Sequence, residues 1–331
     1  KDTLKSLVGQ NFHKVLLSFP TFGLVLFTIL PLIVMILVAF TNYSSTYMNP
    51  KHLFDWVGMY NFKTLFGLTN VGGDDFVAVF ARIMLWTLIW AIFATFTNYF
   101  FGMIVAMLIN RKGIRLKKIW RTILVTTIAV PQFISLLFLS KLLAENGGIN
   151  SLLLKWGWIS SPIGFLDDAL TAKITIIVVN MWIGIPYTML MCSGILMNIP
   201  ADLYESARID GASPFKMYMK ITLPYMLFVT GPYLISNFVG NINNFNVIYL
   251  LSGGNPMFTN INGNLIDTSK VYSAGQTDLL ITWLYKMVMT STNKEYGVAS
   301  VIGIVIFIIL ATISSIVYGR TNAVKNEGDF Q

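Results

Sequence analysis

Asparagine side chains are concentrated in one apolar run near residue 240, where they could hydrogen-bond a polar solute. Asn237, Asn241 and Asn244 are spaced i, i+4 and i+7, which places them on one face of a helix. An amide in hydrocarbon costs free energy unless it is hydrogen-bonded. Two interpretations stay open: the amides replace water around a solute's hydroxyl groups, or they hold helices together, at about 0.6 to 2 kcal/mol each.

A second polar stretch, residues 199–224, separates two apolar runs and has the signals of two helices joined by a turn. Pro200 suits the first turn of a helix, because that turn has no use for its missing N–H. Gly211 can adopt the left-handed conformation that ends such a helix, and Ser213 before Pro214 is typical of a second helix start. The pattern predicts a helix over about 200–210, a sharp turn and another short helix. Such an element can present its turn to a partner protein.

The chain around these two stretches has the composition of an integral membrane protein. Of its 331 residues 55% are hydrophobic and 11% are charged, and the mean hydropathy is +0.67, so too few charges exist to cover a soluble protein of this size. A helix needs about 20 apolar residues to cross the hydrocarbon core. Six runs qualify, which predicts an all-α protein with one transmembrane domain over 15–319. The expected spans are 15–40, 83–109, 119–143, 174–197, 223–251 and 298–318.

The basic residues predict the orientation of these six spans. With six spans, both termini, the connection between the second and third spans, and segment 199–222 lie on one side. Most of the 23 lysines and arginines fall on that side, and so does the whole formal excess of positive charge. The positive-inside rule then places the N-terminal segment 1–14, segment 199–222 and the tail 320–331 in the cytoplasm. The basic cluster 111–121 is a short connection between spans, so binding of nucleic acid is not expected.

The outer connections, 41–82, 144–173 and 252–297, are longer than the inner ones. Two of them contain short amphipathic segments, GMYNFKTLF and TDLLITWLYKMVM, that are too short to span a membrane. The outer connections are therefore either docking surfaces for another protein or solvated links between spans.

The sequence lacks the residues that several other functions would require. No P-loop pattern occurs, and the spans hold almost no ionisable groups of the kind that bind coupling ions. His13 and His52 fall on opposite sides of the membrane, and Cys192 is the single cysteine, so neither a metal pair nor a disulfide is expected. The alternatives are a secondary transporter or channel, and a membrane-embedded enzyme. The adjacent acidic pairs lie in outer loops, with no pattern that completes an active site.

Segment 199–224 resembles the cytoplasmic coupling loop of ABC importer permeases. The family pattern is Glu-Ala-Ala, three residues, Gly, nine residues, Ile, one residue and Leu-Pro, and here only Ser206 departs from it. The segments AVPQF, NMWIGIPY and NNFNVIYLLSGGNP are similar to permease subunits of carbohydrate importers, in particular the larger permease subunit of maltose and maltodextrin transporters. The resemblance covers about residues 15–319, with six spans here rather than eight.

The resemblance implies the type I ABC importer permease fold and a role as the transmembrane subunit of an ATP-driven, binding-protein-dependent importer in the bacterial plasma membrane. The substrate would be a malto-oligosaccharide or a related oligosaccharide. The implied partners are a second permease, two ATPase subunits and an extracellular sugar-binding protein. The chain itself would be no enzyme and bind no cofactor, since ATP and Mg would be held by the ATPase subunits.

The resemblance also implies two sets of contact residues. Sugar contacts fall on Asn180, Ile183, Gly184, Tyr187, Asn237, Gly240, Asn241 and Asn244. ATPase contacts fall on Leu203, Glu205, Ser206, Ala207, Asp210, Gly211, Ser213, Phe215, Ile221, Leu223 and Pro224. Gly240 stands where the family has a large aromatic residue and Asn237 where it has a small hydroxyl residue. A wider site and a different or longer sugar are therefore expected.

Overall fold

The computed structural model describes residues 12–44, 52, 54–69, 73–111, 113–261, 263–291 and 294–320. Most of the expected cytoplasmic segments 1–14 and 320–331 lie outside these ranges. Within them the chain is helical, apart from one antiparallel hairpin of β1 (Asn260–Ile261) and β2 (Asn264–Leu265). The prediction of a helical protein is confirmed for the described residues.

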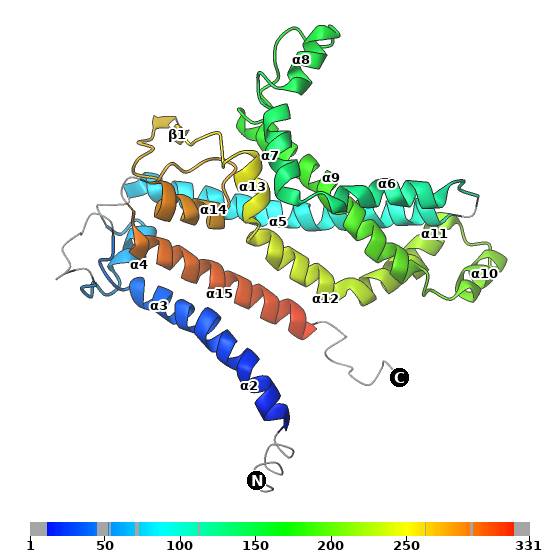
Figure 1. Cartoon of the computed structure of the whole chain (residues 1–331), viewed down its shortest axis with the longest axis horizontal. Coiled ribbons are helices and arrows are strands. Elements are labelled where there is room, and N and C mark those ends of the chain that lie inside the picture. The colour runs from blue at the N-terminus through cyan, green and yellow to red at the C-terminus, as the bar shows by residue number, and fades with distance from the viewer. Residues whose placement is uncertain are drawn as a thin grey trace.

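Four helical segments among the described residues are long and apolar enough to cross a membrane. The first joins α2 (Phe12–Leu24), the π-helical turn η1 (Val25–Ile29) and α3 (Leu30–Val38). The others are α5 (Gly73–Asn110), α9 (Ala169–Leu196) and α15 (Tyr296–Arg320), and α15 runs beside α3 (Figure 1). They correspond to the first, second, fourth and sixth expected spans.

The third expected span, 119–143, is not a straight helix. It is divided into α6 (Lys117–Ala129) and α7 (Gln132–Leu142), which are bent by 89° at Val130 and Pro131. A proline lacks a backbone N–H and forces the residue before it toward an extended conformation, and Val130 is extended, with ψ 127°. If this bent pair counts as one span, the described residues contain five candidates. The helix α8 (Gly148–Lys155) follows.

The fifth expected span, 223–251, is also interrupted, and it is not among the candidates that length and apolarity identify. Helix α12 (Leu223–Ile242) stops at Asn243, and α13 (Phe245–Leu251) starts again after Asn244. At its other end α12 continues from α11 (Pro214–Met217) and the π-helical turn η3 (Tyr218–Thr222) without leaving helical geometry. The prediction of six spans is therefore not confirmed among the described residues.

The buried apolar core follows α5 along its length. Near its start, Phe76 and Phe80 pack against Trp283; in its middle, Trp86 and Trp90 face α9 and α13. Near its end, residues such as Met103 pack with residues of α9 and α12. This central helix therefore fixes the positions of α9 and α12, which hold the polar residues singled out in the sequence.

The layer at the start of α5 contains α4 (Tyr60–Leu65), α14 (Leu280–Tyr285) and the π-helical turn η4 (Lys286–Thr290). The predicted amphipathic helix in the last outer connection is confirmed as α14 and η4, but it is largely buried. A buried ion pair, which the sequence did not reveal, lies at its start: Lys286 Nζ is 2.7 Å from Asp278 Oδ2. Burial raises the pKa of Asp278, and the neighbouring ammonium group opposes that shift.

Lys286→Met is expected to destabilise this layer by about 3–5 kcal/mol, because it leaves the fully buried Asp278 carboxylate without its charged partner. Asp278 also accepts hydrogen bonds from the Gly275 N–H (2.7 Å) and the Thr282 hydroxyl (2.9 Å). Turning the carboxylate toward water would break these two bonds. Thermal unfolding of the purified protein measures the effect. The control is Lys286→Met combined with Asp278→Asn, which removes both charges. The expectation is wrong if the single variant is as stable as this double variant.

Candidate functional site

The segment that resembles a coupling loop forms the predicted helix, turn and helix. Helix α10 (Ala201–Ile209) is followed by Gly211 at φ +72°, and Ser213 Oγ accepts a hydrogen bond from the Lys216 N–H at 3.3 Å. Two details differ from the prediction. Pro200 is the N-cap residue of α10 rather than its first helical residue. The second helix is not a separate short one, since α11 continues through η3 into α12.

The turn exposes large apolar side chains. Leu203 is 49% exposed, Phe215 73% and Ile209 86%. Of the predicted ATPase-contact residues, Ala207, Ile221 and Leu223 are partly buried and the rest are exposed: Leu203, Glu205, Ser206, Asp210, Gly211, Ser213, Phe215 and Pro224. Exposed apolar side chains grouped on a short element mark an interaction site. Ile209 was missed in the sequence; its signal was an apolar residue at the end of a polar helix, just before Asp210 and Gly211.

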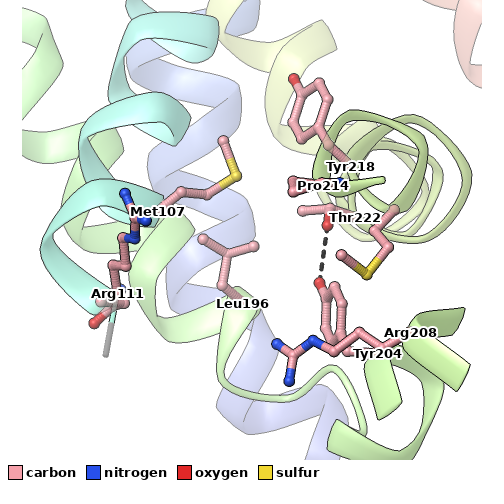
Figure 2. Close-up of a pocket in the computed structure, with 10 residues that line it drawn as sticks. Met107, Arg111, Leu196, Tyr204, Arg208, Pro214, Tyr218 and Thr222 are labelled. Atoms are coloured by element: carbon pink, nitrogen blue, oxygen red, sulfur yellow. Dashed lines mark hydrogen bonds between the residues drawn. The ribbon is translucent and has the colours of Figure 1, made fainter. Parts of the chain in front are cut away.

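A hydrogen bond braces α10 against the helix that follows the turn. The hydroxyls of Tyr204 and Thr222 are 2.8 Å apart, and Figure 2 shows this bond at one wall of a cavity. Because α11, η3 and α12 form one continuous helical stretch, a force applied at the turn acts directly on α12. The turn is thus connected mechanically to the helix that holds Asn237 and Asn241.

The asparagines of the fifth expected span are hydrogen-bonded to one another. Asn244 Nδ2 donates to Asn241 Oδ1 at 3.2 Å, Asn241 Nδ2 to Asn237 Oδ1 at 2.7 Å, and Asn237 Nδ2 to the Tyr233 hydroxyl at 2.8 Å. Asn241 Nδ2 also donates to Thr95 Oγ1 of α5 at 3.0 Å. These four bonds use the amide groups inside the protein, which supports the helix-holding interpretation for the buried Asn241.

The prediction of a single asparagine face is wrong for Asn244. It lies outside α12 and caps α13, because its Oδ1 accepts a hydrogen bond from the Val247 N–H at 3.2 Å. Asparagine competes with helical hydrogen bonding through such local bonds, which explains why the helix ends there. Gly240 is exposed, and a Cβ atom added at this position would meet no atom within 4 Å.

A cavity of about 330 Å³ lies where the bent third span meets α9. Three predicted sugar-contact residues, Ile183, Gly184 and Tyr187, line it. Its other lining residues are Thr127, Ile128, Val130, Pro131, Gln132, Ser135 and Trp182. The rings of Tyr187 and Tyr233 are 6.4 Å apart, so the cavity adjoins the chain of asparagines. The structure thus brings most of the predicted residues of the two spans into one region.

Two buried amides between α5 and α9 are incompletely hydrogen-bonded. Among the described residues, Asn180 Nδ2 and Asn98 Oδ1 have no partner, although both atoms are buried. The Asn98 amide sits so close to Gly184 that any side chain at residue 184 would overlap it. Buried polar groups are nearly always paired in native proteins, so this region is a candidate for a polar ligand or a rearrangement.

Sequence reasoning missed several residues of this region. Gln132, Ser135 and Thr127 come from the third span, whose bend creates the cavity wall, and Asn98 comes from the second span. The usable signal was Pro131 inside an apolar run, followed at once by the polar Gln132. Isolated polar residues such as Asn98 gave no periodic pattern.

The cavity can bind a neutral polar molecule but offers little for catalysis. Its lining carries hydroxyl groups, one amide and two exposed aromatic rings, of Trp182 and Tyr187, and no charged side chain. Hydroxyls and amides can replace water around a solute's hydroxyl groups, and aromatic faces cover its apolar side. No group of three or more metal-ligating side chains occurs within the described residues.

Comparisons with known proteins agree with this arrangement. The family described as "Binding-protein-dependent transport system inner membrane component" matches residues 98–323. The maltodextrin transport system permease protein MalC of Streptococcus pneumoniae serotype 4 (strain ATCC BAA-334 / TIGR4) is 35% identical, over 99% of this chain and 73% of that protein. The galactooligosaccharides transport system permease protein GanP of Bacillus subtilis (strain 168) is 32% identical, over 99% and 74%.

A solved structure has a similar fold. It is a bacterial alginate ABC transporter in complex with an alginate pentasaccharide-bound periplasmic protein. One of its chains is 19% identical, with a TM-score of 0.71, over 96% of this chain and 97% of that chain. The overall fold of this chain is therefore similar to one found in a solved structure.

Proposed function

Because the chain belongs to the family of binding-protein-dependent transport system inner membrane components, we propose that it forms the path by which an oligosaccharide crosses the bacterial plasma membrane. It is a permease of a binding-protein-dependent sugar importer, and its fold is that of the type I ABC importer permeases. The predicted membership of the ABC carbohydrate importer permeases is thereby confirmed. Its relatives are permease subunits, which are not themselves enzymes.

The α10–α11 turn carries the coupling part of the proposal. It exposes Leu203, Ile209 and Phe215 next to a continuous helix that reaches Asn241. One of two ATPase subunits, which hold ATP and Mg, docks on this turn, and closure of the ATPase dimer displaces α11, η3 and α12 as a unit. A second permease subunit completes the membrane part, and an extracellular sugar-binding protein delivers the substrate to the outer connections. Relatives named for maltodextrin and for galactooligosaccharides support an oligosaccharide substrate.

We assign the sugar contacts to the cavity wall of α9 and the neighbouring end of α12. The residues are Asn180, Ile183, Gly184, Tyr187, Asn237, Gly240, Asn241 and Asn244. The open space at Gly240 and the exposed rings of Trp182 and Tyr187 leave room for more than one sugar ring. In the proposed orientation the α6–α7 pair and the α12–α13 pair complete six crossings, and both termini and the α10–α11 turn face the cytoplasm.

Ile209→Asp is expected to remove the ATPase subunits from the purified complex, because it places a charge on the most exposed apolar side chain of the turn. Co-purification of the permease with its ATPase subunits measures the effect. The control is Leu265→Asp, which makes the same chemical change at an 88% exposed leucine of the β1–β2 hairpin, far from the turn (Figure 1). If the Leu265→Asp complex loses the ATPase subunits while the Ile209→Asp complex retains them, the α10–α11 turn is not the ATPase contact.

Reconstitution into vesicles tests transport itself. Uptake of labelled maltodextrin is expected only when the second permease, the ATPase subunits, ATP and the binding protein are all present. Uptake by the purified chain alone, without ATPase subunits, would instead identify a secondary transporter or a channel.

A further inference from the structure

A cavity lined by two arginines lies between the α10–α11 turn and the ends of α5 and α9. Its volume is about 530 Å³, within the range of small-molecule sites. It is lined by Met107, Asn110, Arg111, Leu196, Tyr204, Arg208, Pro214, Met217, Tyr218 and Thr222. Figure 2 shows Arg111 and Arg208 on different elements around it.

The charge of this cavity is uncompensated within the part of the chain that the structure describes. Arg111 and Arg208 form no ion pair there, and no carboxylate lines the cavity. Two more cations converge on its wall: Lys117 Nζ donates to the Asn110 carbonyl at 3.3 Å, and Arg121 Nη2 to Asn110 Oδ1 at 3.1 Å. A cluster of cations facing only neutral acceptors attracts an anion.

One of these cations still has an unused donor. Arg121 Nε is buried and has no hydrogen-bond partner among the described residues. A buried donor without a partner is uncommon in native structures, and an anion or a bound polar group is one remedy. The Arg121 side chain is held against Asn110, which itself lines the cavity, so the unused donor lies beside the cavity wall.

The cavity also has the surroundings of a lipid site. Met107, Leu196 and Met217 give it an apolar wall. Helix α6, which starts next to it, exposes Ile119, Trp120 and Ile123, each more than half exposed. Tryptophan is enriched at the membrane interface, and basic pockets between spans on the cytoplasmic side bind anionic headgroups.

We propose that this cavity binds the phosphate group of an anionic phospholipid between Arg111 and Arg208, with the acyl chains lying along α6. The lipid then contacts both the end of α5 and helix α10, so it holds the coupling turn against the spans. The proposal rests on the cytoplasmic orientation of the proposed function. An acidic segment of an ATPase subunit would use the same charges, but the apolar wall and the exposed face of α6 favour a lipid.

The test uses the assembled permease complex purified in detergent with phosphatidylglycerol, and native mass spectrometry to measure retained lipid. Arg111→Gln with Arg208→Gln is expected to weaken retention about 30-fold, because each basic residue near an anionic headgroup contributes roughly a five-fold change in affinity. The control, Arg115→Gln with Lys118→Gln, removes the same charge from exposed positions outside the cavity and is expected to retain the lipid. Arg208→Gln alone gives a smaller loss in the same direction.

Three results would overturn the lipid site. In the first, the control loses as much lipid as the cavity variant. In the second, the cavity variant retains the lipid but loses the ATPase subunits. In the third, the wild type binds inorganic phosphate in place of phosphatidylglycerol. Lipid retention is measured without sugar, so it does not depend on transport. A complex that retains the lipid but does not import sugar would contradict the proposed function and leave the lipid site standing.

Discussion

Gly211→Val is expected to lower ATP-driven sugar uptake at least about tenfold while the permease still folds. Gly211 has φ +72°, in the left-handed region, and a residue with a Cβ atom pays about 1–2 kcal/mol there, more if it is β-branched. About 1.4 kcal/mol corresponds to a tenfold change in a population. The ratio of the native turn to its other conformations then falls by about tenfold or more, so α10 presents Leu203 and Ile209 correctly less often. Uptake into vesicles and ATP hydrolysis, measured together, report the loss of coupling.

The surroundings of Gly211 make this experiment easy to interpret. A Cβ atom at Gly211 meets nothing within 4 Å, so crowding cannot cause the defect. Gly211→Asn is the matched control, because asparagine tolerates the left-handed conformation and is larger than alanine. We expect the asparagine variant to import sugar nearly normally. If valine and asparagine behave alike, the conformation of the turn does not control coupling.

The turn was predictable because its causes are local. Ser213 before Pro214 starts a helix, and Gly211 stops one, wherever the rest of the chain lies. The apolar runs likewise predicted the long helices α5, α9 and α15, since length and composition suffice. The coupling motif then added a family and a role that capping residues alone do not imply.

The sequence did not place the interruptions of the third and fifth spans at residues 130–131 and 243–244, because each depends on contacts across the fold. Pro131 signals a break, but the 89° bend between α6 and α7 depends on what the two halves pack against. Asn244 gives no such signal, since an asparagine can sit in a helix or cap one. Asn244 caps α13 because its side chain hydrogen-bonds to Asn241 and to the Val247 N–H.

The sequence predicted only part of the polar site, because other residues of the site come from a different helix. Sequence spacing identified Asn237 and Asn241, which share helix α12, but could not identify Thr95 and Asn98, which reach the site from α5. The ion pair of Asp278 and Lys286 was equally hidden, because the two residues are separated by a helix start. Partners that are distant along the chain leave no periodic trace.

Asn241→Leu is expected above all to destabilise the assembled permease, because Asn241, one of the proposed sugar contacts, also holds α12 against α5. Asn241 is 7% exposed, and its replacement removes the hydrogen bonds that Asn237 Oδ1, Asn244 Nδ2 and Thr95 Oγ1 make to its side chain. Each buried polar group left unpaired costs about 1–3 kcal/mol. The thermal unfolding temperature of the purified complex should therefore fall, and the amount of assembled complex with it.

Tyr187→Ala is the contrasting variant, because Tyr187 is 56% exposed and lines the cavity at the bend of the third span. Its loss should leave thermal unfolding nearly unchanged and raise the maltodextrin concentration needed for half-maximal uptake. The two variants separate the two interpretations of the polar residues, since one removes a bond between α12 and α5 and the other removes an aromatic face from the cavity. If Tyr187→Ala leaves the concentration dependence of uptake unaltered while Asn241→Leu alters it in a stable complex, the sugar path follows the asparagines and not the cavity.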